Sequence, residues 1–166
     1  EIARADPSEY PRSVRPTIPF PNLMNRYITA ADAEHVDLDW CHVEWLVKPG
    51  MVDAKHLLLV RATFPPGEAH NYHFHPVHEE ILYVLEGEMT QYVGDQHRVV
   101  KVGELAHIPA GLPHATYNTG SGTLRFLAIL SPTGEAGPDV VDCFNEEPWK
   151  SLRPPIPYPS QQTPGA

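Results

Sequence analysis

Basic residues, long apolar runs and closely spaced cysteines are all scarce in this sequence of 166 residues. Only 12 Lys and Arg stand against 21 Asp and Glu, and the formal net charge is −9. Nucleic acids and anionic membranes bind through basic surfaces, so we expect neither as a partner. No apolar run approaches the ~18 residues that a membrane-spanning helix requires.

The two cysteines, Cys41 and Cys143, lie far apart in the sequence. They do not form the closely spaced pair that binds metal or catalyses redox exchange, and two residues make no disulfide framework. We therefore expect two ordinary buried thiols. Unpaired thiols are typical of reducing compartments, which favours the cytoplasm.

Proline and histidine are abundant, with 19 and 10 residues. The prolines cluster at both ends of the chain, where they disfavour helix interiors and central strands. We expect an extended, partly docked N-terminal arm over 1–39, a central domain over 40–131, and a C-terminal arm over 132–166 whose end is disordered. Apolar residues within the arms indicate docking, on this chain or on a partner subunit: Ile18, Phe20, Leu23, Trp149, Leu152, Ile156 and Tyr158.

Between the arms the sequence changes to short runs rich in Val, Ile, Leu, Tyr and Thr, separated by turn residues. Eight of these runs predict strands: 41–47, 56–64, 80–87, 88–94, 97–102, 104–109, 114–118 and 123–130. The stretch from Val93 to Gln96 predicts a hairpin turn, and residues 28–35 could form one helical turn capped by Thr29. Because no segment predicts a long helix, the expected fold class is all-β, an antiparallel sandwich or barrel.

Four of the ten histidines lie within nine residues of one another: His70, His73, His75 and His78. On a strand, alternate side chains share a face, so His73 and His75 should point the same way. Glu80 opens the next predicted strand, and His114 lies between two turn segments. Three imidazoles and one carboxylate suit one divalent ion of Fe, Mn, Ni, Co or Zn rather than Ca or Mg.

Two segments around these side chains resemble the two sequence motifs of the cupin superfamily. Residues 67–87 fit G(X)5HXH(X)4E(X)6G at every fixed position: Gly67, His73, His75, Glu80 and Gly87. Residues 103–118 fit G(X)5PXG(X)2H(X)3N at Gly103, Pro109, Gly111, His114 and Asn118. The chain is thereby similar to small single-domain cupins (monocupins) with both motifs intact. The resemblance implies a cupin-type jelly-roll β-barrel in which His73, His75, Glu80 and His114 bind one metal ion.

The resemblance also assigns expectations to the polar residues nearby. Glu80 would be a metal ligand that also accepts a proton from the substrate, while Glu79 would face outward. His70 and His78 lie beside the ligands but outside the motif. Each is a candidate catalytic acid or base, or else a solvated or supporting side chain. The glycines of the motifs are expected at turns, with positive φ.

Strand alternation predicts which side chains reach the interior. If Glu80 faces inward, Tyr83 should lie outside the barrel. Gln91 or Tyr92 on the following strand could contact a substrate, as could Phe126. The expected apolar interior comprises Leu82, Val84, Met89, Leu105, Ile108, Phe126 and Leu127.

A site of three histidines and one glutamate with an open position resembles that of small cupin dioxygenases. The resemblance implies a metal-dependent dioxygenase for a small, mainly apolar or aromatic substrate such as an enol, catechol or diketone. An isomerase, lyase, decarboxylase or cyclase with the metal as Lewis acid is the alternative, and a small-molecule-binding protein without turnover is a third. Cupins pair through sheets or arms, which implies a homodimer. The substrate, the native metal and the pathway stay open at this point.

Overall fold

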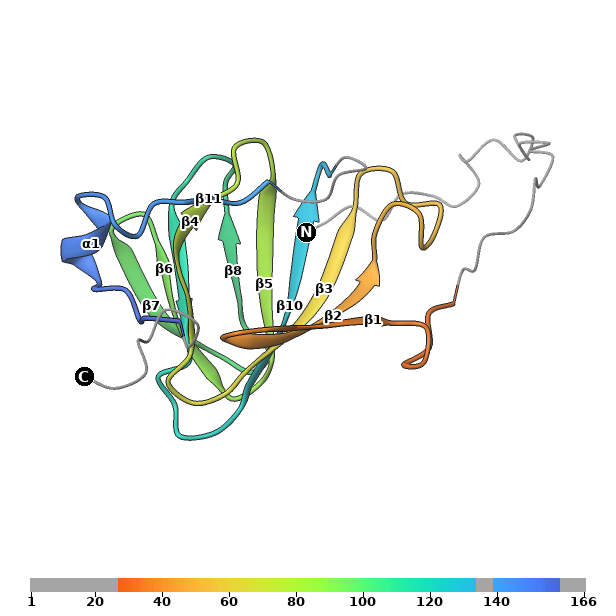
Figure 1. Ribbon diagram of the computed structural model, residues 1–166, viewed down its shortest axis with the longest axis horizontal. Coiled ribbons are helices and arrows are strands. Elements are labelled where there is room, and N and C mark those ends of the chain that lie inside the picture. The colour runs from red at the N-terminus through yellow and green to blue at the C-terminus, as the bar shows by residue number, and fades with distance from the viewer. Residues whose placement is uncertain (1–26, 134–138, 159–166) are drawn as a thin grey trace, which may run out of the picture.

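The computed structural model describes residues 27–133 and 139–158 of the chain. Within them, the strands form two antiparallel sheets that face each other (Figure 1). The first sheet has the order β1 (Glu34–Leu38), β2 (Cys41–Val47), β3 (Leu58–Phe64), β10 (Leu124–Ser131), β5 (Glu79–Glu86) and β8 (Leu105–Ile108). The second has the order β11 (Val141–Asp142), β4 (Ala69–Phe74), β9 (His114–Tyr117), β6 (Glu88–Val93) and β7 (Gln96–Lys101).

This arrangement is an all-β jelly roll, as the sequence predicts. Strands distant in sequence pair with each other, so that β10 lies between β3 and β5 while β9 lies between β4 and β6. The described strands stay in two separate sheets and enclose an interior without closing into one continuous barrel. All eight predicted runs form strands, and β6 and β7 are joined by the predicted hairpin turn, in which Gly94 has φ of 60°.

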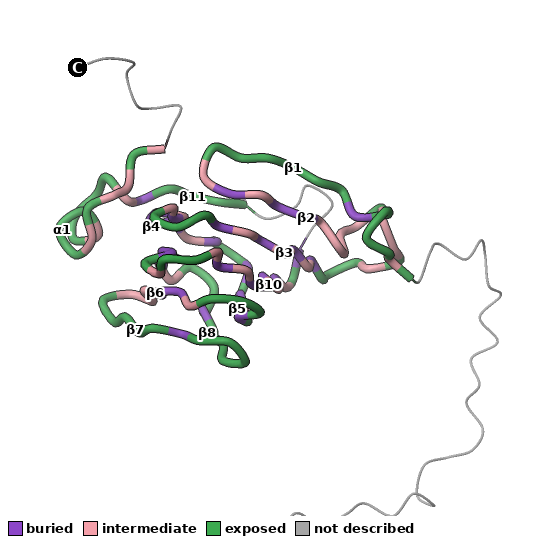
Figure 2. Tube along the Cα trace, turned by 90° about the horizontal axis from the view of Figure 1, so that it is seen from below, coloured by how far each residue is buried: buried purple, intermediate pink, exposed green. Residues whose placement is uncertain are grey.

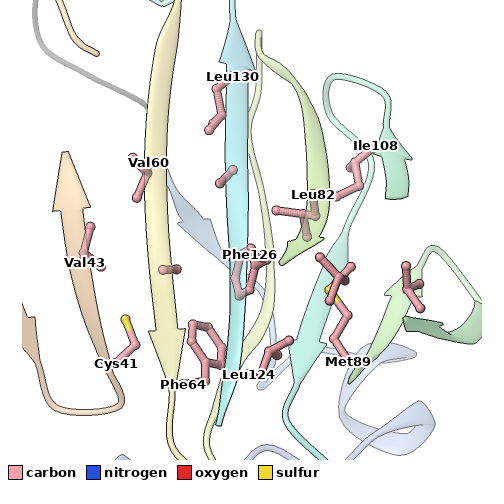
Figure 3. Packing of buried hydrophobic residues seen from close by; sticks show 14 of the residues in the cluster. Cys41, Val43, Val60, Phe64, Leu82, Met89, Ile108, Leu124, Phe126 and Leu130 are labelled. Atoms are coloured by element: carbon pink, nitrogen blue, oxygen red, sulfur yellow. The ribbon is translucent and has the colours of Figure 1, made fainter. Parts of the chain in front are cut away.

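Alternation along the strands builds the core between the two sheets (Figure 3). Every second residue of β3 and of β10 is buried. The buried cluster includes most of the predicted interior: Leu82, Val84, Met89, Ile108 and Phe126. The prediction was wrong for Leu105, which is 54% exposed, and for Leu127, which is only partly buried. Both alternate with inward-facing residues and therefore point out of the sheet.

The first described segment differs from the predicted helical turn. Asp32 N–H donates to Thr29 O at 3.0 Å, which closes a β turn. The Asp32 carboxylate accepts hydrogen bonds from the Thr29 N–H at 2.9 Å and from its hydroxyl at 2.7 Å. Strand β1 begins two residues later, and all five of its residues are exposed (Figure 2). Its two apolar residues, Val36 and Leu38, alternate with polar ones as in a strand but stay exposed, and the sequence-based prediction placed them in the extended arm.

The segment 139–158 packs against the second sheet. A second buried cluster joins it to the strands, with Tyr72, Tyr117 and Cys143 at its centre and Phe144, Trp149 and Ile156 against them. Asn71 fixes the segment, because its side chain donates to Ile156 O and accepts from Ile156 N–H, both at 2.9 Å. Trp149, Ile156 and Tyr158 are thus docked, the last with its ring stacked on Trp40 at a centroid distance of 5.9 Å, whereas Leu152 is 40% exposed. The other apolar residues expected to dock, Ile18, Phe20 and Leu23, lie outside the described residues.

A short helix, α1 (Trp149–Leu152), follows Pro148 in this segment. The sequence predicted extended chain here, because prolines surround it. A proline just before the first turn is nevertheless compatible with a helix. Among the described residues no helix is long and apolar enough to cross a membrane.

Gly87, between β5 and β6, has φ of 73°, and a Cβ there would lie 2.5 Å from the backbone oxygen of Thr123. We predict that Gly87→Ala lowers the free energy of unfolding by about 2 kcal/mol or more, because the left-handed backbone alone costs an alanine roughly 1–2 kcal/mol. Urea denaturation measures the change. Gly122→Ala is the matched control, since a Cβ at Gly122 meets no atom within 4 Å. Equal stabilities of the two variants would contradict the prediction.

Candidate metal centre

The two sheets bring the four predicted ligands together from opposite sides. His73 in β4 is the register partner of His114 at the start of β9. His75 follows β4 directly and lies two positions beyond His73, so both can project to the same side. Glu80 reaches the same point from β5 of the facing sheet.

The four side chains form a compact, buried group. One ligand atom from each lies within 4.8 Å of the others. Glu80 Oε2 is 3.0 Å from His114 Nε2 and 3.7 Å from His75 Nε2. None of the four is more than 6% exposed. Glu79 is exposed instead, 3.2 Å from His107, so the glutamate that faces the interior is Glu80.

Each of the three histidines is oriented by its other ring nitrogen. Nδ1 of His73 donates to Asn71 O at 2.8 Å. His75 Nδ1 donates to Asp139 O at 2.8 Å. His114 Nδ1 donates to Leu112 O at 3.0 Å. These hydrogen bonds fix the tautomer, so each ring presents the lone pair of Nε2 to the centre, as histidine ligands of metals do.

The donor set fits a transition-metal ion. His114 Nε2 is buried and has no hydrogen-bond partner in the described residues, which is costly unless something else occupies that lone pair. Burial, followed by the neighbouring His70, lowers the pKa of His73 well below its usual value. Burial also lowers the pKa of His75, against the opposing effect of Glu80. Neutral imidazoles are the form that binds metal, so the cluster could hold a first-row divalent ion.

Other residues of the two motifs hold the loops around this group. Asn118 donates from Nδ2 to Phe64 O at 3.0 Å and to Gly122 O at 2.9 Å, and its backbone carbonyl accepts from Gly67 N–H at 3.0 Å. Gly111, with φ of 75°, donates its N–H to His75 O at 2.8 Å. The loop that precedes His114 is thereby tied to the segment that carries His75.

A cavity of about 130 Å³ lies beside the ligands. Its walls are mainly apolar side chains of the first sheet: Val43, Trp45, Leu58, Val60, Ala62, Phe64, Leu82, Phe126, Ala128 and Leu130. Cys41, Trp40, His70, Thr116 and Val140 complete the lining around the metal ligands. Among the described residues no Lys or Arg lines it. The cavity can thus enclose a small apolar molecule next to the polar cluster.

Of the three residues that the sequence offered for substrate contact, Phe126 lies in the wall, but Gln91 and Tyr92 do not line the cavity. Gln91 is buried, with its side-chain oxygen accepting a hydrogen bond from the Thr116 hydroxyl at 2.6 Å. Tyr92 packs against Tyr72, with ring centroids 5.8 Å apart. Nothing in the sequence indicated that Trp40, Trp45, Thr116 and Val140 line the cavity, because they come from separate segments that only the fold brings together.

His70 lies directly against the ligands. Its ring stacks on His73 with centroids 3.5 Å apart and on Trp40 with centroids 4.4 Å apart. Burial, with smaller effects of His114 and His75, lowers the pKa of His70 to about 3. The ring is therefore neutral at ordinary pH and lines the cavity as a potential hydrogen-bonding group.

His78 has a different position, outside the cavity lining. Its Nδ1 donates to Pro132 O, and its Nε2 accepts a hydrogen bond from Asp139 N–H at 3.3 Å. Asp139 is also the residue whose carbonyl orients His75. His78 thus links the end of β10 to the segment that holds a ligand, which is the geometry of a supporting side chain.

Comparisons with known proteins identify the family. A cupin domain matches residues 60–130. Protein SchB of Streptomyces halstedii is 30% identical over 63% of this chain and 75% of that protein. The oxalate-binding protein of Thermotoga maritima is 33% identical over 46% of this chain and 63% of that protein. Quercetin 2,3-dioxygenase of Bacillus subtilis is 31% identical over 45% of this chain, but this chain spans only 22% of that enzyme.

Solved structures agree on the fold. An RmlC-like cupin from Shewanella frigidimarina superposes with a TM-score of 0.59, covering 68% of this chain and 95% of that one at 20% sequence identity. At that identity the likeness concerns the fold and not the activity. From the intact motifs, the matched domain and the shared jelly roll, it follows that the chain belongs to the cupin family.

Proposed function

We propose that the chain is a metal-dependent cupin dioxygenase for a small, mainly apolar or aromatic molecule. One divalent ion of Fe, Mn, Ni, Co or Zn would be held by the cluster of His73, His75, Glu80 and His114, and the dioxygenase reaction requires one of the redox-active members of that series. The observation that carries the proposal is the position of this buried donor set beside a small cavity whose other walls are mostly apolar.

The size and polarity of the cavity limit the substrate. Its volume of about 130 Å³ is close to the roughly 150 Å³ of an apolar cavity that encloses one benzene molecule. A single ring or a diketone of similar size would fit, whereas a three-ring flavonol would have to extend outside. The described lining contains no Lys or Arg, so only the bound ion, whose charge Glu80 already reduces, would be available to neutralise a dianion. This favours an apolar substrate over oxalate, the ligand named for the Thermotoga maritima relative.

A redox-active ion, when bound, would supply the electron transfer that a reaction with dioxygen requires. The protein would position the substrate, accept its proton and exclude water from the site. Glu80 can accept the proton of an enol or phenol, since its Oε2 lies at the centre of the site. The neutral ring of His70 can hydrogen-bond a substrate oxygen, and the apolar walls keep water away from it. The likeness to a quercetin 2,3-dioxygenase supports oxygen chemistry on this type of domain.

A non-redox isomerase, lyase, decarboxylase or cyclase is the second candidate. The presence of His70 in the cavity favours it, because an imidazole that is not one of the four ligands could move a substrate proton. In that case the metal would polarise a carbonyl without exchange of electrons. The third hypothesis, a small-molecule-binding protein without turnover, would use the same cavity.

The two thiols support a cytoplasmic location. Cys41 and Cys143 are both free and buried. Burial raises the pKa of the Cys41 thiol to about 12, so it is protonated and unreactive although it lines the cavity. Free, inert thiols of this kind are typical of proteins in reducing compartments.

A homodimer is the expected assembly. Tyr83 and Leu105 are register partners on β5 and β8. Together with Leu85 they expose apolar surface on the outer face of the first sheet, at 36%, 54% and 39% of their area. Exposed apolar groups that adjoin one another favour coverage by another protein surface, here a second copy of the chain.

Metal content tests the site. Protein expressed without added metal and then dialysed should retain about one equivalent of Fe, Mn, Ni or Co by elemental analysis. His75→Ala should weaken retention about tenfold or more, since even partners of the ligands affect affinity to that extent. His107→Ala, at an exposed histidine outside the cluster, should retain the metal. If zinc is the only metal that the wild-type protein retains and that His75→Ala loses, the dioxygenase is excluded. If His75→Ala retains as much metal as the wild type, the proposed ligand set is wrong.

Oxygen consumption tests the reaction. With catechol or pentane-2,4-dione, the metal-loaded protein should consume dioxygen. Ala128→Phe fills the cavity wall and should lower kcat/KM about tenfold, given the cost of overpacking. Leu127→Phe, on the outward side of the same strand, should leave kcat/KM unchanged. Thermal unfolding and metal content of both variants check that they fold. Turnover at an equal rate under argon would contradict the dioxygenase and favour the non-redox candidate.

Assembly can be tested on the outer face of the first sheet. Leu105→Lys should shift the protein from dimer to monomer in size-exclusion chromatography with light scattering, because burying the ammonium group in an interface is costly. Val99→Lys places the same charge on β7, at a residue 48% exposed in the other sheet, and should leave the dimer intact. A monomeric wild-type protein at high concentration would refute the expectation.

A further inference from the structure

A second group of histidines and carboxylates lies on the outer face of the first sheet. In the antiparallel pair of β1 and β2, His35 is the register partner of Glu44, and Asp37 is the partner of His42. Register partners project to the same side of a sheet, as do residues two positions apart, so all four side chains share one face. The alternate residues of β2, which include Val43, line the cavity on the opposite face. This surface cluster is therefore separated from the buried metal centre by the sheet itself.

The distances within the surface cluster suit a metal ion. His35 Nδ1 and His42 Nε2 are 3.2 Å apart and share a hydrogen bond. Two nitrogens bound to one tetrahedral zinc ion at ~2.0–2.1 Å are about 3.3 Å apart, so the two rings already have nearly the required separation. One ligand atom from each of His35, His42 and Glu44 lies within 4.8 Å of the others.

Nδ1 of His42, the ring nitrogen that points away from His35, is hydrogen-bonded to a carboxylate, as is common for histidines that bind metal. His42 Nδ1 donates to Asp37 Oδ1 at 2.6 Å. This hydrogen bond places the proton on Nδ1 and leaves the lone pair of Nε2 directed toward His35. The same pattern, with backbone carbonyls in place of Asp37, orients the three histidines of the buried centre.

Glu44 is fixed and ionised. Arg61 donates to its two carboxylate oxygens from Nε and Nη2, both at 2.5 Å. These hydrogen bonds lower the pKa of Glu44. A carboxylate has about four lone-pair positions, so two remain for a further ligand. With Asp37 included, the carboxylates outnumber the one guanidinium, and the surface cluster has a net negative charge that favours a cation.

We propose that His35, His42 and Glu44 form a second metal site, which binds a zinc ion or a similar first-row cation at the protein surface, with water completing the coordination. Asp37 acts there as the positioning residue for His42. Because β1 is exposed along its whole length (Figure 2), the ion would link this edge strand to β2 through side chains in addition to the backbone pairing. None of these residues belongs to the cupin motifs, and the site does not depend on the proposed function.

Zinc titration of the full-length protein tests the site. After removal of metal with a chelator and dialysis, binding of ZnCl₂ is followed by calorimetry in a buffer that does not bind zinc. The wild-type protein should bind one more equivalent than the double variant His35→Gln, His42→Gln. Asp37→Asn should weaken that additional equivalent about tenfold, the usual effect of removing such a partner. Whether the buried centre also takes zinc does not matter, because that contribution is common to all variants.

His107→Gln is the matched control. His107 is likewise exposed and paired with a carboxylate, Glu79 at 3.2 Å, but among the described residues it belongs to no group of three potential metal ligands. This variant should bind as many zinc ions as the wild type. Amide hydrogen exchange gives an independent result: zinc should slow exchange in β1 of the wild type and not of the double variant. Equal zinc stoichiometry in the wild type and the double variant would overturn the proposal, as would zinc-independent exchange of β1 in the wild type.

Discussion

The buried centre depends on one constraint, which is that three imidazoles must present the same ring nitrogen to one point. Each meets it by donating Nδ1–H to a backbone carbonyl, from Asn71, Leu112 and Asp139. Those carbonyls belong to a strand, a loop and the C-terminal segment, all of them held by backbone pairing or by packing. The geometry of the donor set is therefore determined by the backbone rather than by the histidine side chains alone. Such preorganisation lowers the cost of binding a metal ion.

This constraint explains why the C-terminal segment is part of the site. Asp139 orients His75, and His78 holds Asp139 in place through the backbone N–H. Val140 next to it contributes to the cavity wall. β11 then pairs with β4, and Trp149 and Ile156 anchor the segment on the outer face of the same sheet. A segment that looks like an appended arm in the sequence thus supports a ligand, contributes one residue to the cavity wall and packs on the second sheet.

The sequence predicted those features that depend on local pattern. Period-two alternation identified eight strands, and the motif spacing identified the ligand residues and selected Glu80 over Glu79. It did not identify β1, where Val36 and Leu38 alternate but stay exposed, so that the segment was assigned to the extended arm. The prediction also placed Leu105 and Leu127 in the interior because they are apolar. Strand alternation instead directs both side chains outward. The contacts of Trp40 and Asp139 with the site depend on long-range packing, for which one sequence contains no local signal.

Strand β2 contributes residues to both sites, because its alternate side chains point to opposite faces of the sheet. Its residues Cys41, Val43 and Trp45 face the cavity, while His42 and Glu44 lie on the outer face beside β1, where His42 is partly exposed and Glu44 is buried. The inner donor set is desolvated, so its choice of metal is governed by geometry and by the cost of burying charge. The outer cluster is only partly solvated, since Glu44 is buried while His35 is exposed, and its occupancy would follow the concentration of free metal. Because β2 supplies residues to both sites, an ion bound outside would restrain the edge of the sheet next to the strand that forms one wall of the cavity.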